Sequence, residues 1–376
     1  MKKTLNFLFL LAITLIPTIL IWVPFYFRFG SFWTIPLAKE GMATIVANFD
    51  GPLYLVAAKT LYNPDSISSN YQFPLTNEYY SAHFPLFPLL IKSLSFIFGY
   101  PYSMLLVTLV SSIMALYFFN LHAKKLTNES GALFLTLLFA VFPARWLIVR
   151  SVGSAEPLFV ASILASTYFF SEKKFLYAGI WGMLAQMTKS PGILLFGAYL
   201  LQIFIENIKN LPKIEVKKYI PLLLIPIGLI SVFTFYYFTY GDFWVYFKSG
   251  DNIHLFFPPF QIFNYSAPWV GTFWLEEIIF IYAAWIFSLF KLWKEELYTY
   301  FCFSLIFFTS LIFVAHRDLL RYAIPVIPFF LLGFHEYLVK KEVKIALTII
   351  IIPIYLYGLA FISQNAMPIS NWEPFL

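Results

Sequence analysis

Residues 48–88 read NFDGPLYLVAAKTLYNPDSISSNYQFPLTNEYYSAHFPLFP and separate the first apolar segment from a long series of others. This stretch is the long polar interruption near the start of the chain. Its first acid, Asp50, stands directly before Gly51 and Pro52, and the stretch ends in His83 and an apolar patch spaced by prolines. Because Asp before Pro is a common helix start, a short helix is expected from residue 52 onward.

The composition around this stretch is that of a membrane protein. Of the 376 residues, 60% are hydrophobic and only 12% are charged, far from the balance of a soluble domain. The single cysteine, Cys302, lies in an apolar run. One cysteine excludes a disulfide within the chain and a cysteine metal cluster. The sequence therefore predicts an all-α, polytopic membrane protein that forms a single domain over residues 1–376, with no separate soluble domain.

Eleven apolar stretches are candidate membrane crossings, at 1.5 Å of rise per residue across roughly 30 Å of hydrocarbon. They are residues 4–25, 102–121, 131–149, 155–170, 175–188, 191–206, 219–240, 274–292, 297–315, 321–338 and 345–363. The first stretch could instead be a signal peptide, but no small-residue cleavage site follows it. Residues 86–98 are too short to span and carry Lys92, so an interfacial or re-entrant helix is expected there. Residues 26–101 then form the first outer loop.

The positions of the basic residues predict the orientation of the chain. With the N-terminus in the cytoplasm, an odd number of crossings puts the loops at 122–130, 171–174, 207–218, 291–296 and 339–344 inside. Those loops and the N-terminus hold 15 of the 25 basic residues, all of them lysines. This agrees with the positive-inside rule. The segments around Asp50, Glu156, Lys189 and Arg321 consequently converge on the outer face.

Four motifs resemble those of the PIG-V-like mannosyltransferases, which belong to the GT-C superfamily of integral-membrane glycosyltransferases. The first-loop signature is similar at Asp50, Tyr54, Tyr62 and Phe84-Pro-Leu-Phe-Pro88. The later motifs are Ser154-Ala-Glu156-Pro-Leu-Phe159, Thr188-Lys-Ser-Pro-Gly192 and Arg321-Tyr-Ala-Ile-Pro325. Phe49 replaces the usual tryptophan, and Lys189 replaces an arginine. The order of the motifs is kept over about residues 1–340.

The resemblance implies a GT-C-type bundle of about 11 transmembrane helices with a catalytic first outer loop. It also implies inverting transfer of a hexose, with mannose the first candidate, from a polyprenyl-phosphate donor. The acceptor would be a glycolipid, a glycan or a protein. No Asp-x-Asp triplet and no phosphate-binding glycine loop occurs, so no metal and no other cofactor is expected, and nothing indicates a nucleic-acid partner.

Asp50 is the candidate catalytic base, since transfer to an acceptor hydroxyl needs a group that takes its proton. The alternative role for Asp50 is to cap the helix that starts at Pro52. Lys189, Arg321, Arg317 and His83 are the candidates for the donor phosphate, whose charge cationic side chains can stabilise. Three of these residues have an alternative role. Lys189 could extend its ammonium group to the membrane surface from a helix end, and Arg317 could form a surface ion pair with Asp318. His83 could only pack at the membrane interface.

Glu156 and Tyr54 are the candidates for binding the acceptor or the sugar. Glu156 could also orient a basic partner such as Arg150, or only stabilise the start of its helix. The alternative functions are a lipid-linked oligosaccharide flippase or other transporter, an O-antigen polymerase or ligase, and a non-catalytic assembly subunit. A transporter should carry ionisable groups at mid-membrane and related halves. The short loops favour a prokaryotic plasma membrane, with the active site on its outer face.

Overall fold

The computed structural model describes the chain except for residues 1, 72, 209–214, 265 and 267–273. Of the chain, 76% is helical and 2% is strand. All eleven predicted apolar stretches contain helix. The helices of the bundle are α1 (Lys2–Tyr26), α6 (Tyr100–Leu126), α7 (Glu129–Val141), α8 (Ala144–Val149), α9 (Glu156–Ser171), α10 (Phe175–Thr188), η2 (Ser190–Ile193), α11 (Leu194–Asn207), η4 (Val216–Leu223), α12 (Leu224–Tyr240), α13 (Trp274–Lys294), α14 (Tyr298–Leu311), α15 (Leu319–Tyr322), η8 (Ile324–Val326), α16 (Ile327–Gly333), α17 (His335–Leu338) and α18 (Lys341–Gln364).

Two of the predicted crossings are interrupted, which corrects their interpretation as single helices. The stretch 131–149 is divided into α7 and α8, with Pro143 at the break. The stretch 321–338 is divided into α15, η8, α16 and α17, with Pro325 and Pro328 at the starts of η8 and α16. Proline lacks the backbone N–H of a regular helix and favours the first helical turn, so each of these residues begins a new segment.

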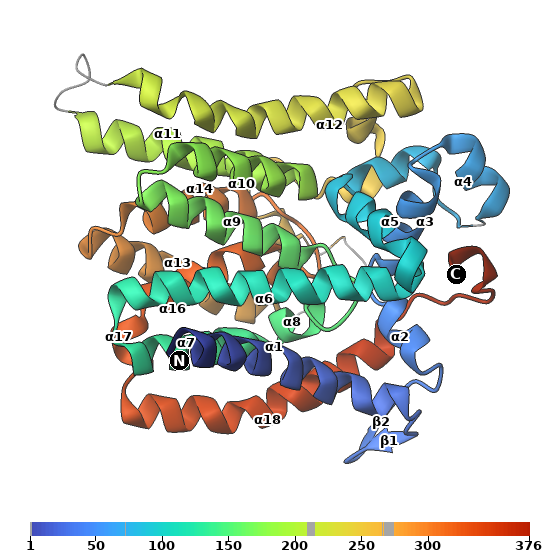
Figure 1. Cartoon of the computed structure of the whole chain (residues 1–376), viewed down its shortest axis with the longest axis horizontal. Helices are drawn as coiled ribbons and strands as arrows, with labels where there is room; N and C mark the ends of the chain where they lie inside the picture. The colour runs from blue at the N-terminus through green and yellow to red at the C-terminus, as the bar shows by residue number, and fades with distance from the viewer. Residues whose placement is uncertain (1, 72, 209–214, 265, 267–273) are drawn as a thin grey trace.

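The long helices run side by side from one end of the molecule to the other (Figure 1). Within the described residues, four segments are long and apolar enough to cross a membrane. They are Phe7–Tyr26, Tyr100–Leu126, Val216–Tyr240 and Lys341–Gln364. The loop predicted at 207–218 lies mostly outside the described residues. The turns at 171–174 and 295–297 lie at the end of the bundle opposite to α3 and α5 (Figure 1).

Residues 26–101 cover one end of the bundle with short elements (Figure 1). These are β1 (Ser31–Phe32), β2 (Ile35–Pro36), α2 (Met42–Val46), α3 (Gly51–Thr60), α4 (Pro64–Asn70), η1 (Asn77–Ala82) and α5 (Leu86–Phe98). The two strands are antiparallel, with Ser31 opposite Pro36. Helix α5 buries Phe87 and Ile91 while Phe96 is 82% exposed. It is thus a short helix with an exposed apolar end, and its interfacial or re-entrant placement stays a prediction.

Two further segments pack on the same end. One carries η5 (Val245–Lys248), η6 (Gly250–Asn252) and η7 (Gln261–Phe263), and the other carries η9 (Glu373–Phe375). The second segment holds residues 26–101 in place, since the Met367 amide donates to the Ala47 carbonyl at 2.8 Å. The Tyr71 hydroxyl likewise donates to the Pro374 carbonyl at 2.9 Å. The segment that contains Asp50 therefore packs against residues 367–375, which lie more than 300 positions away in the sequence.

Helix α10 approaches η4 and α12 closely because two of its glycines, Gly179 and Gly182, line the contact. A Cβ atom on Gly179 would lie 2.1 Å from the Pro221 carbonyl oxygen, and one on Gly182 would lie 2.6 Å from the Ile225 side chain. Close approach through small residues is a common way for membrane helices to associate. The contact fixes the position of α10, whose last turn leads into Lys189.

This contact predicts a stability effect. Gly179→Ala should lower the free energy of unfolding by about 1–3 kcal/mol, because the new methyl group overlaps backbone that cannot move alone. Thermal unfolding in detergent measures the change. Gly197→Ala on α11 is the matched control, since the nearest atom to its Cβ would lie 3.9 Å away. Equal unfolding temperatures for the two variants would contradict the packing described here.

Candidate functional site

Asp50 lies between α2 and α3 and directs its carboxylate away from the helix that it precedes. It occupies the N-cap position of α3, yet its side chain makes no capping hydrogen bond. Instead, Arg321 Nη2 donates to Asp50 Oδ2 at 2.8 Å. The alternative role of Asp50 as a side-chain cap is therefore not supported.

Glu156, the first residue of α9, joins the two predicted cations. Its side chain is buried, and one oxygen, Oε1, accepts from Arg321 Nε at 2.7 Å and from Lys189 Nζ at 2.7 Å. Its other oxygen, Oε2, accepts from the Ser154 hydroxyl. Asp50, Arg321, Glu156 and Lys189 thus form one connected chain of ion pairs, which we call the ion-pair cluster. Four segments far apart in the sequence meet in it.

The structure corrects the partner suggested for Glu156. Arg150 is buried, but its guanidinium donates to the Ala140 carbonyl at 2.8 Å and to the Thr14 carbonyl at 2.6 Å. It makes no hydrogen bond to Glu156 in the described structure. Two backbone carbonyls satisfy part of this buried guanidinium, so its role is to join α1 to the end of α7.

Local structure orients the two cations of the cluster. Lys189 ends α10 in an extended conformation, and the η2 turn follows at once. Gly192 allows this turn, because a Cβ there would lie 2.4 Å from the Gln186 Cα. Arg321 belongs to the short helix α15, and its guanidinium lies over the Phe49 ring at 4.2 Å from the centroid. Stacking and two carboxylates together fix the plane of this guanidinium.

His83 and Tyr54 lie in the same site. Their rings meet edge to face with centroids 4.9 Å apart, and Phe87 packs on the other edge of Tyr54 at the same distance. His83 is buried, and its Nδ1 has no hydrogen-bond partner among the described residues. Burial lowers the pKa of His83, which favours the neutral ring at neutral pH. A neutral imidazole with an open nitrogen can contact a bound ligand.

Burial acts against the ionised form of Asp50, but the basic groups around it, Arg321 foremost, together outweigh burial. Desolvation raises the pKa of the carboxyl, whereas the guanidinium lowers it, and the result lies below the ordinary value of 3.8. Asp50 is therefore a carboxylate at neutral pH. The carboxylate has one oxygen, Oδ2, bound to Arg321, and its side chain is 33% exposed. It remains accessible to a ligand.

Arg317 lies apart from the ion-pair cluster, and its suggested pairing with Asp318 is wrong. Asp318 pairs with Arg145 at 3.0 Å, and the Arg145 guanidinium lies over the Phe361 ring. Arg317 is exposed and forms no ion pair in the described part of the chain. Sequence reasoning missed Arg145 as a site residue, although it is one of the five arginines of the chain.

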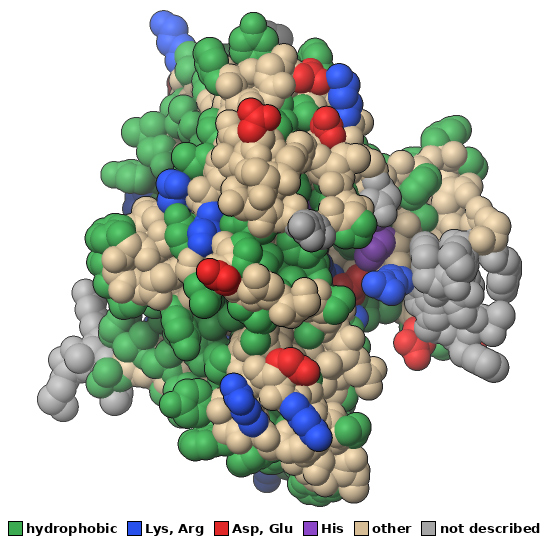
Figure 2. Space-filling view, turned by 90° about the vertical axis from the view of Figure 1, so that its right-hand side faces the viewer, with side chains coloured by type: hydrophobic (Ala, Val, Ile, Leu, Met, Phe, Trp, Pro, Cys, Tyr) green, Lys and Arg blue, Asp and Glu red, His purple; other side chains and the backbone are tan. Residues whose placement is uncertain are grey.

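Two cavities meet at Asp50 and Arg321 of the ion-pair cluster. The smaller, of about 140 Å³, is lined by the cluster together with Tyr54, His83, Ser190 and Tyr246. The larger, of about 740 Å³, is lined by Asp50, Arg145, Arg317, Arg321 and both His254 and His316. Asp50 and Arg321 face both cavities. Figure 2 shows a recess at this end of the molecule in which histidine, basic and acidic side chains gather.

The stretch between α12 and α13 contributes residues that its sequence did not single out. The Tyr246 hydroxyl donates to Ser190 Oγ at 2.9 Å, beside Lys189, and Asn252 lines both cavities. The only indication of these residues in the sequence is that the loop at 241–272 is rich in aromatic side chains and is expected on the same face as Asp50. Asp242, in the same stretch, pairs with Lys248 at 2.6 Å and lines neither cavity. Among the described residues, no group of three or more His, Cys, Asp or Glu side chains could hold a metal ion.

No protein-family model and no curated protein matches this chain. Solved structures do match. The structure of ArnT from Cupriavidus metallidurans bound to undecaprenyl phosphate is 13% identical with a TM-score of 0.56, covering 97% of this chain and 66% of that one. The archaeal oligosaccharyltransferase AglB from Archaeoglobus fulgidus, in complex with an inhibitory peptide and a dolichol-phosphate, is 11% identical with a TM-score of 0.52, covering 98% and 57%.

Both proteins are GT-C glycosyltransferases, and this chain has their helical membrane fold. The predicted fold class is thereby confirmed, and the chain is an integral membrane protein. It spans about 57 to 66% of the length of the structures that it matches. The number of crossings and the resemblance to the PIG-V-like family stay predictions.

The Asp50–Arg321 pair predicts a pH dependence of stability. Because the pKa of Asp50 is lower in the folded protein, its contribution is present above the unfolded value of 3.8 and is lost as the pH falls through the folded value. The difference in unfolding temperature between wild type and Asp50→Asn should therefore shrink as the pH falls below about 4. Asp65→Asn, at an exposed position on α4, is the control. A difference that does not change with pH would contradict the pairing.

Proposed function

We propose that this chain transfers a hexose, with mannose the first candidate, from a polyprenyl-phosphate donor to an acceptor at the outer or lumenal membrane face. The observation that carries the proposal is the ion-pair cluster at one end of an apolar helical bundle, where Asp50 and Arg321 line two adjoining cavities. The cluster contains the same residues whose motifs resemble those of the PIG-V-like mannosyltransferases.

In this proposal, Asp50 is the base. The acceptor hydroxyl gives its proton to the free Oδ1 of Asp50 while its oxygen forms a bond to the anomeric carbon. The bond from that carbon to the phosphate oxygen breaks, and the polyprenyl phosphate leaves with the electron pair. A single displacement of this kind inverts the anomeric centre. The ionised state of Asp50 at neutral pH and its access to both cavities support this role.

Lys189 and Arg321 would bind the phosphate that leaves. Lys189 uses one of its three donors on Glu156, and Arg321 uses Nε and one N–H of Nη2, so both keep donors for phosphate oxygens. Glu156 would hold both cations in place by accepting a hydrogen bond from each. Tyr54 and the neutral His83 line the same small cavity and would contact the sugar or the phosphate, while Arg317 lines the larger cavity.

The matched structures support the class of donor. One is bound to undecaprenyl phosphate and the other to a dolichol-phosphate, and both are lipid-linked carriers. The alternatives remain a flippase and an O-antigen polymerase or ligase. A transporter calls for ionisable residues at mid-membrane, whereas Asp50, Lys189 and Arg321 lie at an end of the bundle, beside α3 and the last turn of α10.

Loss of the base tests the proposal. In proteoliposomes supplied with a panel of polyprenyl-phosphate hexoses and a membrane extract as the acceptor source, Asp50→Asn should lower turnover by roughly 10²- to 10⁴-fold. Release of the lipid phosphate is the readout, with and without chelator. Asp65→Asn should keep wild-type turnover. Near-normal release by Asp50→Asn, or no release by wild type with any donor, would overturn the assigned role or the reaction class.

The proposed orientation in the membrane has its own test. With the active site outside, a cysteine at Ser69 on α4 should react with an impermeant maleimide in intact cells. A cysteine at Lys341, at the start of α18, should react only after the cells are opened. The native Cys302 is buried and should stay unlabelled. The opposite labelling pattern would place the cluster on the cytoplasmic side.

A further inference from the structure

The proposed transfer reaction leaves most of the larger cavity without a role. Lys189, one of the two residues assigned to the donor phosphate, lines the smaller cavity but not the larger, whereas Asp50 and Arg321 line both. The larger cavity has a volume of about 740 Å³, within the range of roughly 300–1,000 Å³ that is usual for pockets that hold small ligands. An acceptor bound there lies beside the candidate base.

Arginine is the cationic residue of this cavity. Three of the five arginines of the chain line it, namely Arg145, Arg317 and Arg321, and among the described residues no lysine does so. Lysine is nevertheless the commoner basic residue of the chain. A guanidinium presents a planar set of N–H donors that matches the oxygens of a carboxylate or a phosphate, whereas an ammonium group acts as a point charge. The choice of side chain therefore indicates binding of oxyanions.

Two of the three guanidiniums already have oxyanion partners within the protein. Arg145 pairs with Asp318 at 3.0 Å. Arg321 pairs with Asp50 at 2.8 Å and with Glu156 at 2.7 Å. These pairs use both carboxylates that line the larger cavity, Asp50 and Asp318. Their charges compensate one another, so these two arginines are not available to a ligand in the way that an unpaired arginine is.

Arg317 is the cation that remains. It lies between α14 and α15, it is exposed, and no carboxylate of the described chain lies within ion-pair distance of it. Burial and the nearby basic groups, Arg317 among them, lower the pKa of the neighbouring His316 to about 4, so this ring adds no charge at neutral pH. The wall of the larger cavity therefore carries one uncompensated positive charge, and it is the charge of Arg317.

The position of this charge, and not its stability, indicates a role. Water solvates an exposed guanidinium, so Arg317 needs no partner for folding. It stands, however, on the wall of the cavity that Asp50 also lines. Asp50 is itself a carboxylate and repels a second anion, so an anionic group of a bound acceptor lies at Arg317, away from the reacting hydroxyl. The neutral amides Asn252 and Gln364 also line the cavity and suit the hydroxyl groups of a sugar.

We propose that the larger cavity binds an acidic acceptor, a sugar that carries a phosphate or carboxylate group, with the anionic group at Arg317 and the reacting hydroxyl at Asp50. This inference rests on the proposed function, because it assigns the acceptor of that reaction. Arg317 then selects the acceptor, while Lys189 and Arg321 bind the donor phosphate.

Fractionation of the acceptor source tests the proposal on the wild-type protein. The membrane extract is separated on an anion exchanger, and each fraction is added to proteoliposomes that contain the polyprenyl-phosphate hexose donor. Sugar transfer should follow the retained, anionic fraction. Equal or faster transfer with the neutral fraction would overturn this inference and leave the glycosyl transfer intact. No transfer and no release of lipid phosphate with either fraction would overturn the glycosyl transfer, and this inference with it.

Chemical treatment of the anionic fraction identifies the charged group. Aqueous hydrofluoric acid cleaves phosphate esters, and a carbodiimide with ethanolamine converts carboxylates to neutral amides. Loss of transfer after the first treatment assigns a phosphate, and loss after the second assigns a carboxylate. Full transfer after both treatments would contradict recognition of the charge.

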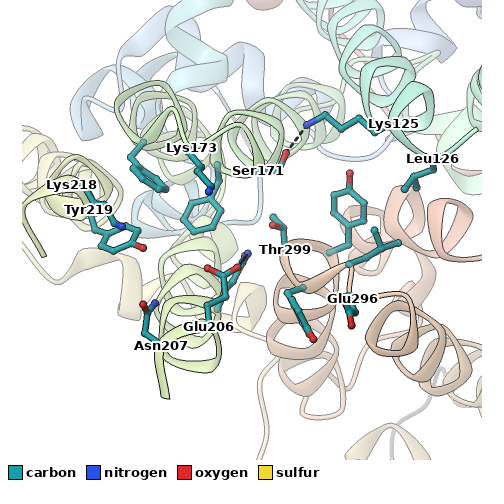
Figure 3. A pocket seen from close by; sticks show the side chains of 16 residues that line it. Lys125, Leu126, Ser171, Lys173, Glu206, Asn207, Lys218, Tyr219, Glu296 and Thr299 are labelled. Atoms are coloured by element: carbon teal, nitrogen blue, oxygen red, sulfur yellow. Dashed lines mark hydrogen bonds between the residues drawn. The ribbon is translucent and has the colours of Figure 1, made fainter. Parts of the chain in front are cut away.

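A variant assigns the recognition to Arg317. Arg317→Gln should raise the KM for the anionic acceptor about tenfold, as expected for the loss of a charge-assisted hydrogen bond, and should not raise the KM for the donor. Lys218→Gln is the matched control, and both KM values should stay at the wild-type level. Lys218 is also exposed and forms no ion pair in the described structure, but it lines a different cavity, of about 880 Å³, at the opposite end of the bundle (Figure 3).

An unchanged KM for the acceptor in Arg317→Gln, with intact folding shown by thermal unfolding, would contradict the assignment. A raised KM for the donor alone would contradict it as well, since Arg317 would then bind the donor phosphate. Should the variant not fold, the fractionation with wild type decides the matter alone.

Discussion

The site of this protein depends on one guanidinium held between two carboxylates. Arg321 binds Asp50 at 2.8 Å and Glu156 at 2.7 Å, and Lys189 completes the pairing on Glu156. Removing charges from water is costly, and a buried carboxylate such as Glu156 is tolerated only with partners of this quality. The pairing therefore requires the starts of α3, α9 and α15 and the end of α10 to meet at one point. The ends of these elements cannot move independently.

The rest of the fold supports this meeting point from both sides. On one side, the small residues between α10 and α12 set the position of Lys189. On the other, the Asn48 amide donates to the Ile362 carbonyl at 2.8 Å, and the Asn365 amide donates back to the Asn48 side chain at 3.0 Å. These bonds join the residue two before Asp50 to the end of α18. The position of the candidate base thus depends on residues more than 300 positions away in the chain.

Much of this arrangement is predictable from the sequence, and the remainder has a physical reason. Apolar runs of sufficient length predict the helices, and the number of crossings together with the positions of the lysines predicts that Asp50, Glu156, Lys189 and Arg321 face one side. The partners within the site are not predictable in this way. Arg150 is near Glu156 in sequence but binds backbone carbonyls, whereas Arg321 is 165 positions away and binds Glu156. Tertiary packing decides such pairs.

The central claim is that the ion-pair cluster binds the lipid phosphate of a glycosyl donor. The most direct measurement is an experimental structure of the protein with bound polyprenyl phosphate, in lipid nanodiscs. We expect phosphate oxygens within hydrogen-bond distance of Lys189 and Arg321, with Asp50 open to the adjoining cavity. A phosphate bound elsewhere, with the cluster unchanged and out of reach, would contradict it.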